Sequence, residues 1–65
     1  MKNSLNNIKS TLATAYDFCE QGFSLMNKKN FKDTIGCCNN AIKINTNYRV
    51  AYLLKDFAYY GIKKN

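Results

Sequence analysis

The stretch that decides the fold runs from Tyr16 to Asn47, where apolar residues recur at intervals of three and four. Its order is Phe18-x2-Gln21-Gly22-x2-Leu25, then Phe31-x2-Thr34-Ile35-x2-Cys38-x2-Ala41-Ile42-x-Ile44-Asn45-Thr46-Asn47. Such intervals are typical of helices that bury one face, and no sustained alternation of apolar and polar residues favours a strand. The stretch therefore predicts two helices, and the short connection between them favours antiparallel neighbours.

The first of these helices is expected to begin well before Tyr16. Ser4 is a good N-cap residue, and the helix is expected to run from there to about Asn27. Its apolar stripe consists of Leu5, Ile8, Leu12, Ala15, Cys19 and Phe23.

The second and third helices are bounded by asparagine-rich turns. The second is expected to start after Asn30 and to stop near Asn45. Asn30 and Asp33 are spaced like a capping box, with Asp in place of the usual Glu or Gln. The third helix is expected from about Tyr48, with Asn47 as its cap, and to fray before the end of the chain.

The chain is short for a self-sufficient fold. With 65 residues it makes one domain that buries only about 60% of its unfolded surface. Three cysteines, two of them adjacent, and the absence of histidine disfavour both a disulfide framework and a zinc site. No cofactor is expected, and association with itself or with another protein is the expected source of further stability.

The middle of the second helix contains Gly36, Cys37 and Cys38. Gly36 is expected to be a close-packing point, Cys38 to point inward and Cys37 to be partly exposed. Structural, reduced cysteines indicate an intracellular, reducing compartment such as the cytoplasm. The acid-free segment before Tyr16 leaves a mitochondrial destination open, although it has no arginine. No apolar stretch approaches the ~20 residues that span a bilayer.

The order of residues from Tyr16 to Asn47 resembles one tetratricopeptide (TPR) repeat, a helical hairpin with a period of 34 residues. Three further pairs repeat at that period, namely Phe18 with Tyr52, Phe23 with Phe57, and Leu25 with Tyr59. The chain departs from the family pattern at Gln21 (for leucine), Thr34 (for alanine), Cys38 (for an aromatic residue) and Thr46 (for proline). The helix after Asn47 is similar to the first helix of a second repeat.

The resemblance implies an all-α fold in which an antiparallel hairpin and a third helix stack with the right-handed twist of TPR proteins. Within the single domain 1–65, residues 1–14 are interpreted as an N-terminal extension or arm. Residues 15–47 form the TPR-like hairpin and residues 48–65 a capping helix. Gly22 and Ala41 fall where the family places small residues to let its helices approach closely.

The resemblance also implies a function, because the first helix of each repeat in this family lines a concave groove. The groove is expected to hold an apolar helix or peptide, which makes the chain a protein-binding adaptor or a small subunit of a complex. Residues at groove positions are Tyr16, Cys19, Glu20, Phe23, Met26, Asn27, Val50, Leu53, Leu54, Phe57 and Tyr60. The partner-binding residues are predicted to be Tyr16, Cys19, Phe23, Met26, Val50, Leu53, Phe57 and Tyr60.

Three alternatives for these apolar residues stay open at this stage. They can form the core, since apolar stripes in so small a domain commonly do. They can be covered by the N-terminal segment, or by the same surface of a second copy in a homo-oligomer.

The basic residues are spread along the chain and are interpreted first as a solvated surface, with a different function as the alternative. The net charge is +6, from ten basic and four acidic residues. Tyr59 and Tyr60 lie among Lys55, Lys63 and Lys64, which suggests a small basic RNA- or ribosome-associated protein as the alternative. Catalysis is not expected, because there is no histidine to act as a general base.

Overall fold

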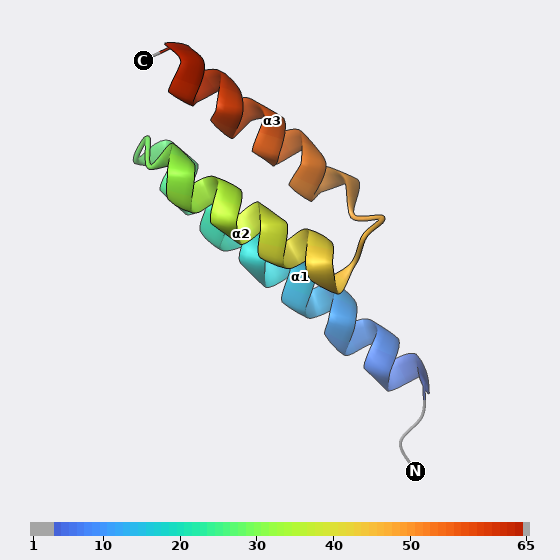
Figure 1. Cartoon of the computed structure of the whole chain (residues 1–65). Helices are drawn as coiled ribbons and strands as arrows, with labels where there is room; N and C mark the ends of the chain where they lie inside the picture. Colours follow the sequence, from blue (N-terminus) through green and yellow to red (C-terminus); the bar gives the residue numbers. More distant parts are fainter. Residues whose placement is uncertain (1–3, 65) are drawn as a thin grey trace.

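Three helices make up the part of the chain that the computed structural model describes, namely the backbone of residues 4–64 and the side chains of residues 14–64. They are α1 (Ser4–Asn27), α2 (Phe31–Ile44) and α3 (Arg49–Lys64), and residues 4–64 contain no strand. The predicted all-helical class is therefore confirmed. In Figure 1, α2 runs back along the C-terminal half of α1, and α3 runs back along α2. Residues 4–14 continue α1 as a helix that extends past α2.

The turn between α1 and α2 is closed by two backbone hydrogen bonds. The Asn30 N–H donates to the Leu25 carbonyl at 2.9 Å, and the Lys29 N–H donates to the Met26 carbonyl at 2.9 Å. Together they form a Schellman motif, which satisfies carbonyls at the end of α1. Lys29 occupies the left-handed position of this motif, with φ 62°, where glycine is usual.

We expect Lys29→Gly to stabilise the protein by about 1 kcal/mol, because glycine adopts the left-handed conformation without the steric cost that a side chain imposes. Urea unfolding followed by circular dichroism measures the change. Lys28→Gly is the matched control, since no positive φ is recorded at Lys28. It is expected to lower stability by freeing the unfolded chain. An equal effect of both substitutions would contradict the turn geometry.

The start of α2 differs from the expected capping box. Asn30 makes no side-chain cap hydrogen bond, and its Nδ2 instead donates to Asp33 Oδ2 at 2.9 Å. The two side chains are thus bonded to each other and not to the backbone N–H groups that a capping box would satisfy. The Asn30 carbonyl accepts from the Thr34 N–H at 3.1 Å and so begins the helix.

The turn before α3 also differs from expectation by one residue. Asn45 Oδ1 accepts a hydrogen bond from the Asn47 N–H at 3.1 Å, which folds the chain back locally. The Tyr48 carbonyl then accepts from the Ala51 N–H at 3.1 Å, and α3 begins at Arg49. Tyr48 therefore holds the N-cap position that was predicted for Asn47.

Small residues form the core between the helices. Among residues 14–64, seven hydrophobic residues are buried, and four of them are alanines, so the three helices approach closely. The buried hydrophobic residues are Ala15, Cys19, Cys38, Ala41, Ala51, Leu54 and Ala58.

Thr34 is the one polar residue that is buried in the part of the chain whose side chains the structure describes. Its Oγ1 donates to the Asn30 carbonyl at 2.9 Å and lies 3.3 Å from the Gly22 carbonyl. The hydroxyl is thus satisfied inside the core and ties α2 to α1, so a threonine is tolerated at this buried position.

Two glycines allow close contacts between helices. A Cβ at Gly22 would lie 2.8 Å from Leu54 Cδ2, so α1 and α3 meet at this point. A Cβ at Gly61 would lie 2.5 Å from Phe31 Cε1, so the last turns of α3 pack on the start of α2.

Gly36 was expected to be a close-packing point, and this expectation is wrong. A Cβ built at Gly36 meets nothing within 4 Å, and the residue is exposed. We therefore expect Gly36→Ala to raise the free energy of unfolding by about 1 kcal/mol through helix propensity alone. Thermal unfolding followed at 222 nm, a wavelength for helix content, checks this. A lower melting temperature would show that a neighbour does occupy this space.

Candidate functional site

The helix α3 carries two neighbouring apolar stripes. The buried stripe consists of Ala51, Leu54 and Ala58, which pack toward the other helices. The second stripe is shifted by one residue, or about 100° of rotation, and it is exposed. Its members are Val50 (41% exposed), Leu53 (58%), Phe57 (58%) and Tyr60 (62%). The apolar arc of α3 is thus wider than the surface that its neighbours cover.

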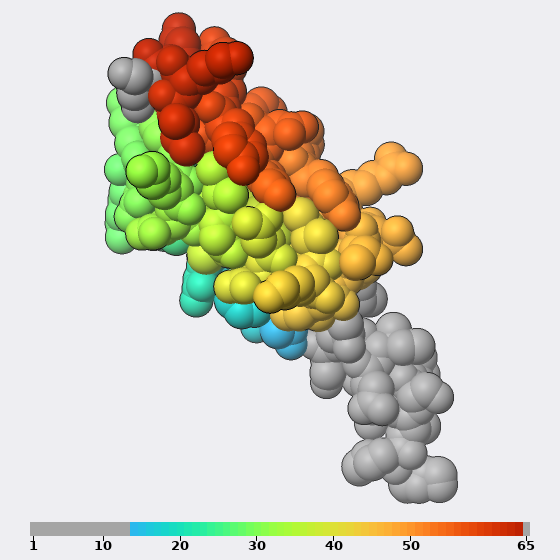
Figure 2. Space-filling view, in the orientation of Figure 1, coloured from blue at the N-terminus to red at the C-terminus, as the bar shows by residue number. Residues whose placement is uncertain are grey.

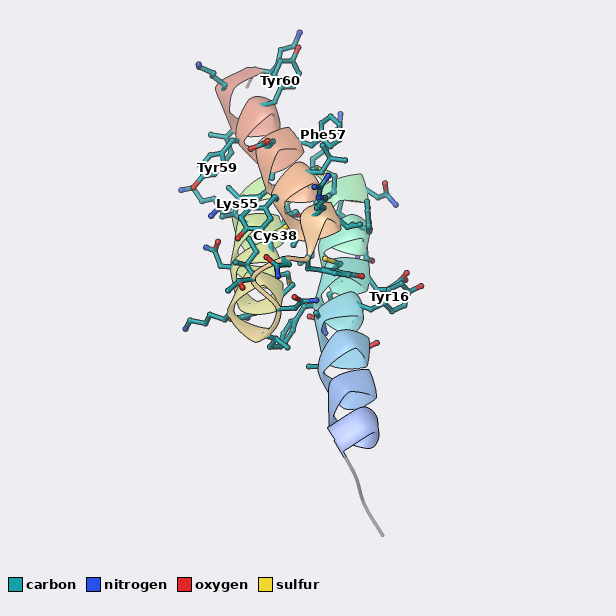
Figure 3. The ribbon with its side chains drawn as sticks, turned by 90° about the vertical axis from the view of Figure 1, so that its right-hand side faces the viewer. Tyr16, Cys38, Lys55, Phe57, Tyr59 and Tyr60 are labelled. Atoms are coloured by element: carbon teal, nitrogen blue, oxygen red, sulfur yellow. The ribbon has the colours of Figure 1, made fainter. Side chains whose placement is uncertain are left out.

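The helix α1 adds two aromatic side chains to this surface. Tyr16 and Phe23 lie two turns apart on α1, and both are exposed. Gly22 of α1 lies against Leu54 of α3, and each has an exposed neighbour in the sequence, Phe23 and Leu53. The exposed residues of α1 and the exposed stripe of α3 therefore lie near each other. In Figure 3, Tyr16 and Phe57 extend to the same side of the molecule, and Tyr59 and Lys55 lie on the other.

We call the six residues together the apolar face: Tyr16, Phe23, Val50, Leu53, Phe57 and Tyr60. Figure 2 shows the position of α3, in orange to red, along one edge of the molecule. Single apolar side chains scattered over a surface are normal in soluble proteins. Six large ones on one side of so small a chain form a patch, which requires an explanation.

Two of the eight predicted binding residues do not belong to this face. Cys19 is only 2% exposed and lies in the core, and Met26 is partly buried and packs against that core. Both lie on the side of α1 that faces the other helices. Leu54, another predicted groove position, is also buried, whereas Glu20 and Asn27 are exposed.

A second exposed flank of α3 was not predicted as a group, although Tyr59 was named for the RNA-binding alternative. It contains Tyr52, Tyr59 and Ile62, of which the two tyrosines are seven residues apart. That spacing was available in the sequence as a signal. Tyr52 has a structural contact, because its hydroxyl donates to the Thr46 carbonyl at 2.9 Å and holds α3 against the preceding turn.

Charged groups lie at both ends of the apolar face. At one end, a hydrogen bond to the Glu20 carboxylate, together with its negative charge, raises the pKa of the Tyr16 hydroxyl. At the other end, the Lys64 Nζ lies 5.9 Å from the centre of the Tyr60 ring, within cation–π range.

The cysteines behave as small apolar residues. Cys38 is fully buried and Cys37 is partly exposed, as predicted. Burial raises the pKa of the Cys38 thiol from 9.0 to about 11 and also raises the pKa of Cys19 and Cys37. A thiol needs a lowered pKa to be reactive at neutral pH, so these environments do the opposite. Within the described residues, no three His, Cys, Asp or Glu side chains are grouped to hold a metal ion.

The raised thiol pKa predicts a loss of stability in alkali. Between pH 9 and 11 the unfolded Cys38 loses its proton while the folded residue keeps it. The folded state then binds more protons, so the free energy of unfolding is highest below pH 9 and falls as the pH approaches 11. Urea unfolding at several pH values measures this slope. Cys38→Ala should have a shallower slope, and an unchanged slope would contradict the assignment.

Comparisons with protein-family models, with curated protein sequences and with solved structures give no significant match for this chain. Across residues 4–64, none of the helices has the length and apolar character that crossing a membrane requires.

Proposed function

We propose that the chain is a non-catalytic module that binds another protein through the apolar face. The observation that carries this proposal is the second stripe of α3, from Val50 to Tyr60, which is apolar at helical spacing yet exposed. Apolar surface left in water has no stabilising role in the isolated chain, whereas covering it would contribute about 25 cal/mol per Å². A large apolar patch of this kind is typical of an interaction site.

The partner surface that fits best is an amphipathic helix or an apolar peptide. Val50, Leu53, Phe57 and Tyr60 follow one another at steps of three, four and three residues along α3. A partner helix with apolar side chains at similar steps can place them between these residues. Aromatic residues are among the types that most often carry binding energy at interfaces. Such a module would serve as an adaptor or as a small subunit of an assembly.

We further propose that the helices stack as in TPR proteins, with α1 and α2 as an antiparallel hairpin and α3 as the first helix of a second repeat. The 34-residue spacing of Phe23 and Phe57 supports this, because both are exposed on the first helix of their repeat. The contact of Gly22 with Leu54 and the full burial of Ala41 are further support.

Two alternatives for this surface were considered, and one of them, binding of RNA, is an outcome of the test. The N-terminal residues Leu5, Ile8 and Leu12, which were considered as a cover, have side chains outside the described residues. Binding of RNA is favoured by one observation, the exposed Tyr59 and Tyr60 among lysines. It would appear as nucleic-acid affinity that falls steeply with salt.

The test is the mass of the native species, measured by light scattering after recovery from the source cell and again on the isolated chain. A stoichiometric complex with one other protein supports the proposal. If no protein partner is recovered, and the isolated chain is a monomer that binds RNA at about 50 mM salt, RNA binding replaces protein binding as the proposed function.

A further inference from the structure

One end of the apolar face gathers lysines from two separate segments. Lys28, Lys29 and Lys32 lie around the turn between α1 and α2, and Lys63 and Lys64 lie in the last turn of α3. The packing of Gly61 against Phe31 brings these two segments together. All five lysines are exposed, and we call them the lysine end.

Little negative charge compensates the lysine end. The carboxylates nearest in sequence are those of Asp33, which already accepts a hydrogen bond from Asn30, and of Asp56, which lies seven residues before Lys63 on α3. At the opposite end of the face lie Asp17 and Glu20 on α1 and Arg49 at the start of α3. Glu20 lies one turn after Tyr16 on α1, at the same end of the face.

The lysine end is continuous with the apolar face. Lys64 lies over the ring of Tyr60, which is the last member of the exposed stripe. Lys28 and Lys29 follow the exposed Phe23 by five and six residues, in the turn after α1. A helix lying along the apolar face would therefore extend toward these lysines.

Building on the proposed function, we infer that the partner helix has acidic residues at one end, which lie against the lysine end. Opposite charges at the rim fix the orientation of a bound helix and raise its rate of association. A second copy of this chain fits poorly, because the end opposite the lysines has only the carboxylates of Asp17 and Glu20, with Arg49 beside them, and Asp56 lies part-way along α3. It would also add another net charge of +6.

The experiment is a selection from a display library of helical peptides on the immobilised full chain at physiological salt. Enriched peptides are expected to have apolar residues at helical spacing and Asp or Glu grouped at one end. An enriched peptide should bind Lys28→Glu/Lys63→Glu/Lys64→Glu about tenfold more weakly than the unchanged chain, a penalty of about 1.4 kcal/mol.

The matched control is Lys43→Glu/Lys55→Glu/Asn39→Asp/Asn40→Asp, which changes the net charge equally but leaves both the lysine end and the apolar face intact. It is expected to bind the peptide within about twofold of the unchanged chain, because screening over ~8 Å limits distant charges. If the lysine-end variant and the control variant weaken peptide binding equally, the inference is overturned. Enriched peptides without grouped acidic residues would also overturn it.

The proposed function fails separately from this inference. It is overturned when no peptide is enriched, or when enriched peptides bind Phe57→Glu as well as the unchanged chain. Peptides that need Phe57 but show no preference for acidic residues would overturn only the acidic partner. A concentration-dependent dimer that excludes all peptides would replace the partner helix with a second copy.

Discussion

Leu54→Ala is expected to lower the free energy of unfolding by about 3 kcal/mol, the largest effect of any single truncation among residues 14–64. Leu54 is the largest aliphatic side chain in the buried core and is 2% exposed. The alanine-rich surroundings cannot easily collapse onto the space it leaves, because the backbones are already close. A domain of this size rarely has more than about 3–5 kcal/mol of stability, so a large fraction of the variant should be unfolded at 25 °C.

The contact of Leu54 with Gly22 allows a sharper form of this test. A methyl group at Gly22 would lie 2.8 Å from Leu54 Cδ2, so Gly22→Ala alone should destabilise by about 1–2 kcal/mol through overpacking. In the Leu54→Ala background the clash is absent, and Gly22→Ala should become neutral or stabilising. Urea unfolding of all four proteins measures the coupling. Additive effects would contradict the packing of α1 on α3.

The second large effect is expected on binding. Phe57→Glu should weaken the recovered protein complex by about hundredfold or more, because it places a charge at the centre of the apolar face. Phe57 is 58% exposed in the isolated chain, so the helical content and melting temperature should change little. Titration of the purified partner, followed by fluorescence anisotropy, gives the loss in affinity.

Tyr59→Glu is the matched control for Phe57→Glu. Tyr59 is on the same helix and is 52% exposed, but it lies on the other flank of α3. It introduces the same charge at a similar exposure, and the partner should bind it nearly as well as the unchanged chain. If Tyr59→Glu abolishes binding and Phe57→Glu does not, the partner occupies the flank that contains Tyr52 and Tyr59, and the assignment of the apolar face is wrong.

The helices could be predicted from the sequence nearly to the residue, because their limits depend on local signals. The stripe from Leu5 to Phe23 and the polar turns at 28–30 and 45–47 were sufficient for this. The details of the turns were not predictable in the same way. Whether Asn30 caps the backbone or bonds Asp33 depends on dihedral angles and side-chain positions that residue types do not specify.

The division between core and surface was predictable only in part. Periodicity indicates which residues share a side of a helix, but not how much of a wide apolar arc the neighbouring helices cover. Cys19 and Phe23 lie in one sequence stripe, yet Cys19 is in the core and Phe23 is exposed. Gly36 likewise has a neighbour only if another helix crosses there, and none of the described residues does so.

Binding of a partner through the apolar face is tested most directly by NMR cross-saturation on the labelled chain in complex with its recovered protein partner. Signal loss transferred from the partner reports which residues it touches. We expect the strongest signal loss at Leu53 and Phe57, a weaker loss at Tyr16 and Phe23, and little change at Tyr59. Strongest loss at Tyr59 or along the outer surface of α2, with Leu53 and Phe57 unaffected, would contradict it.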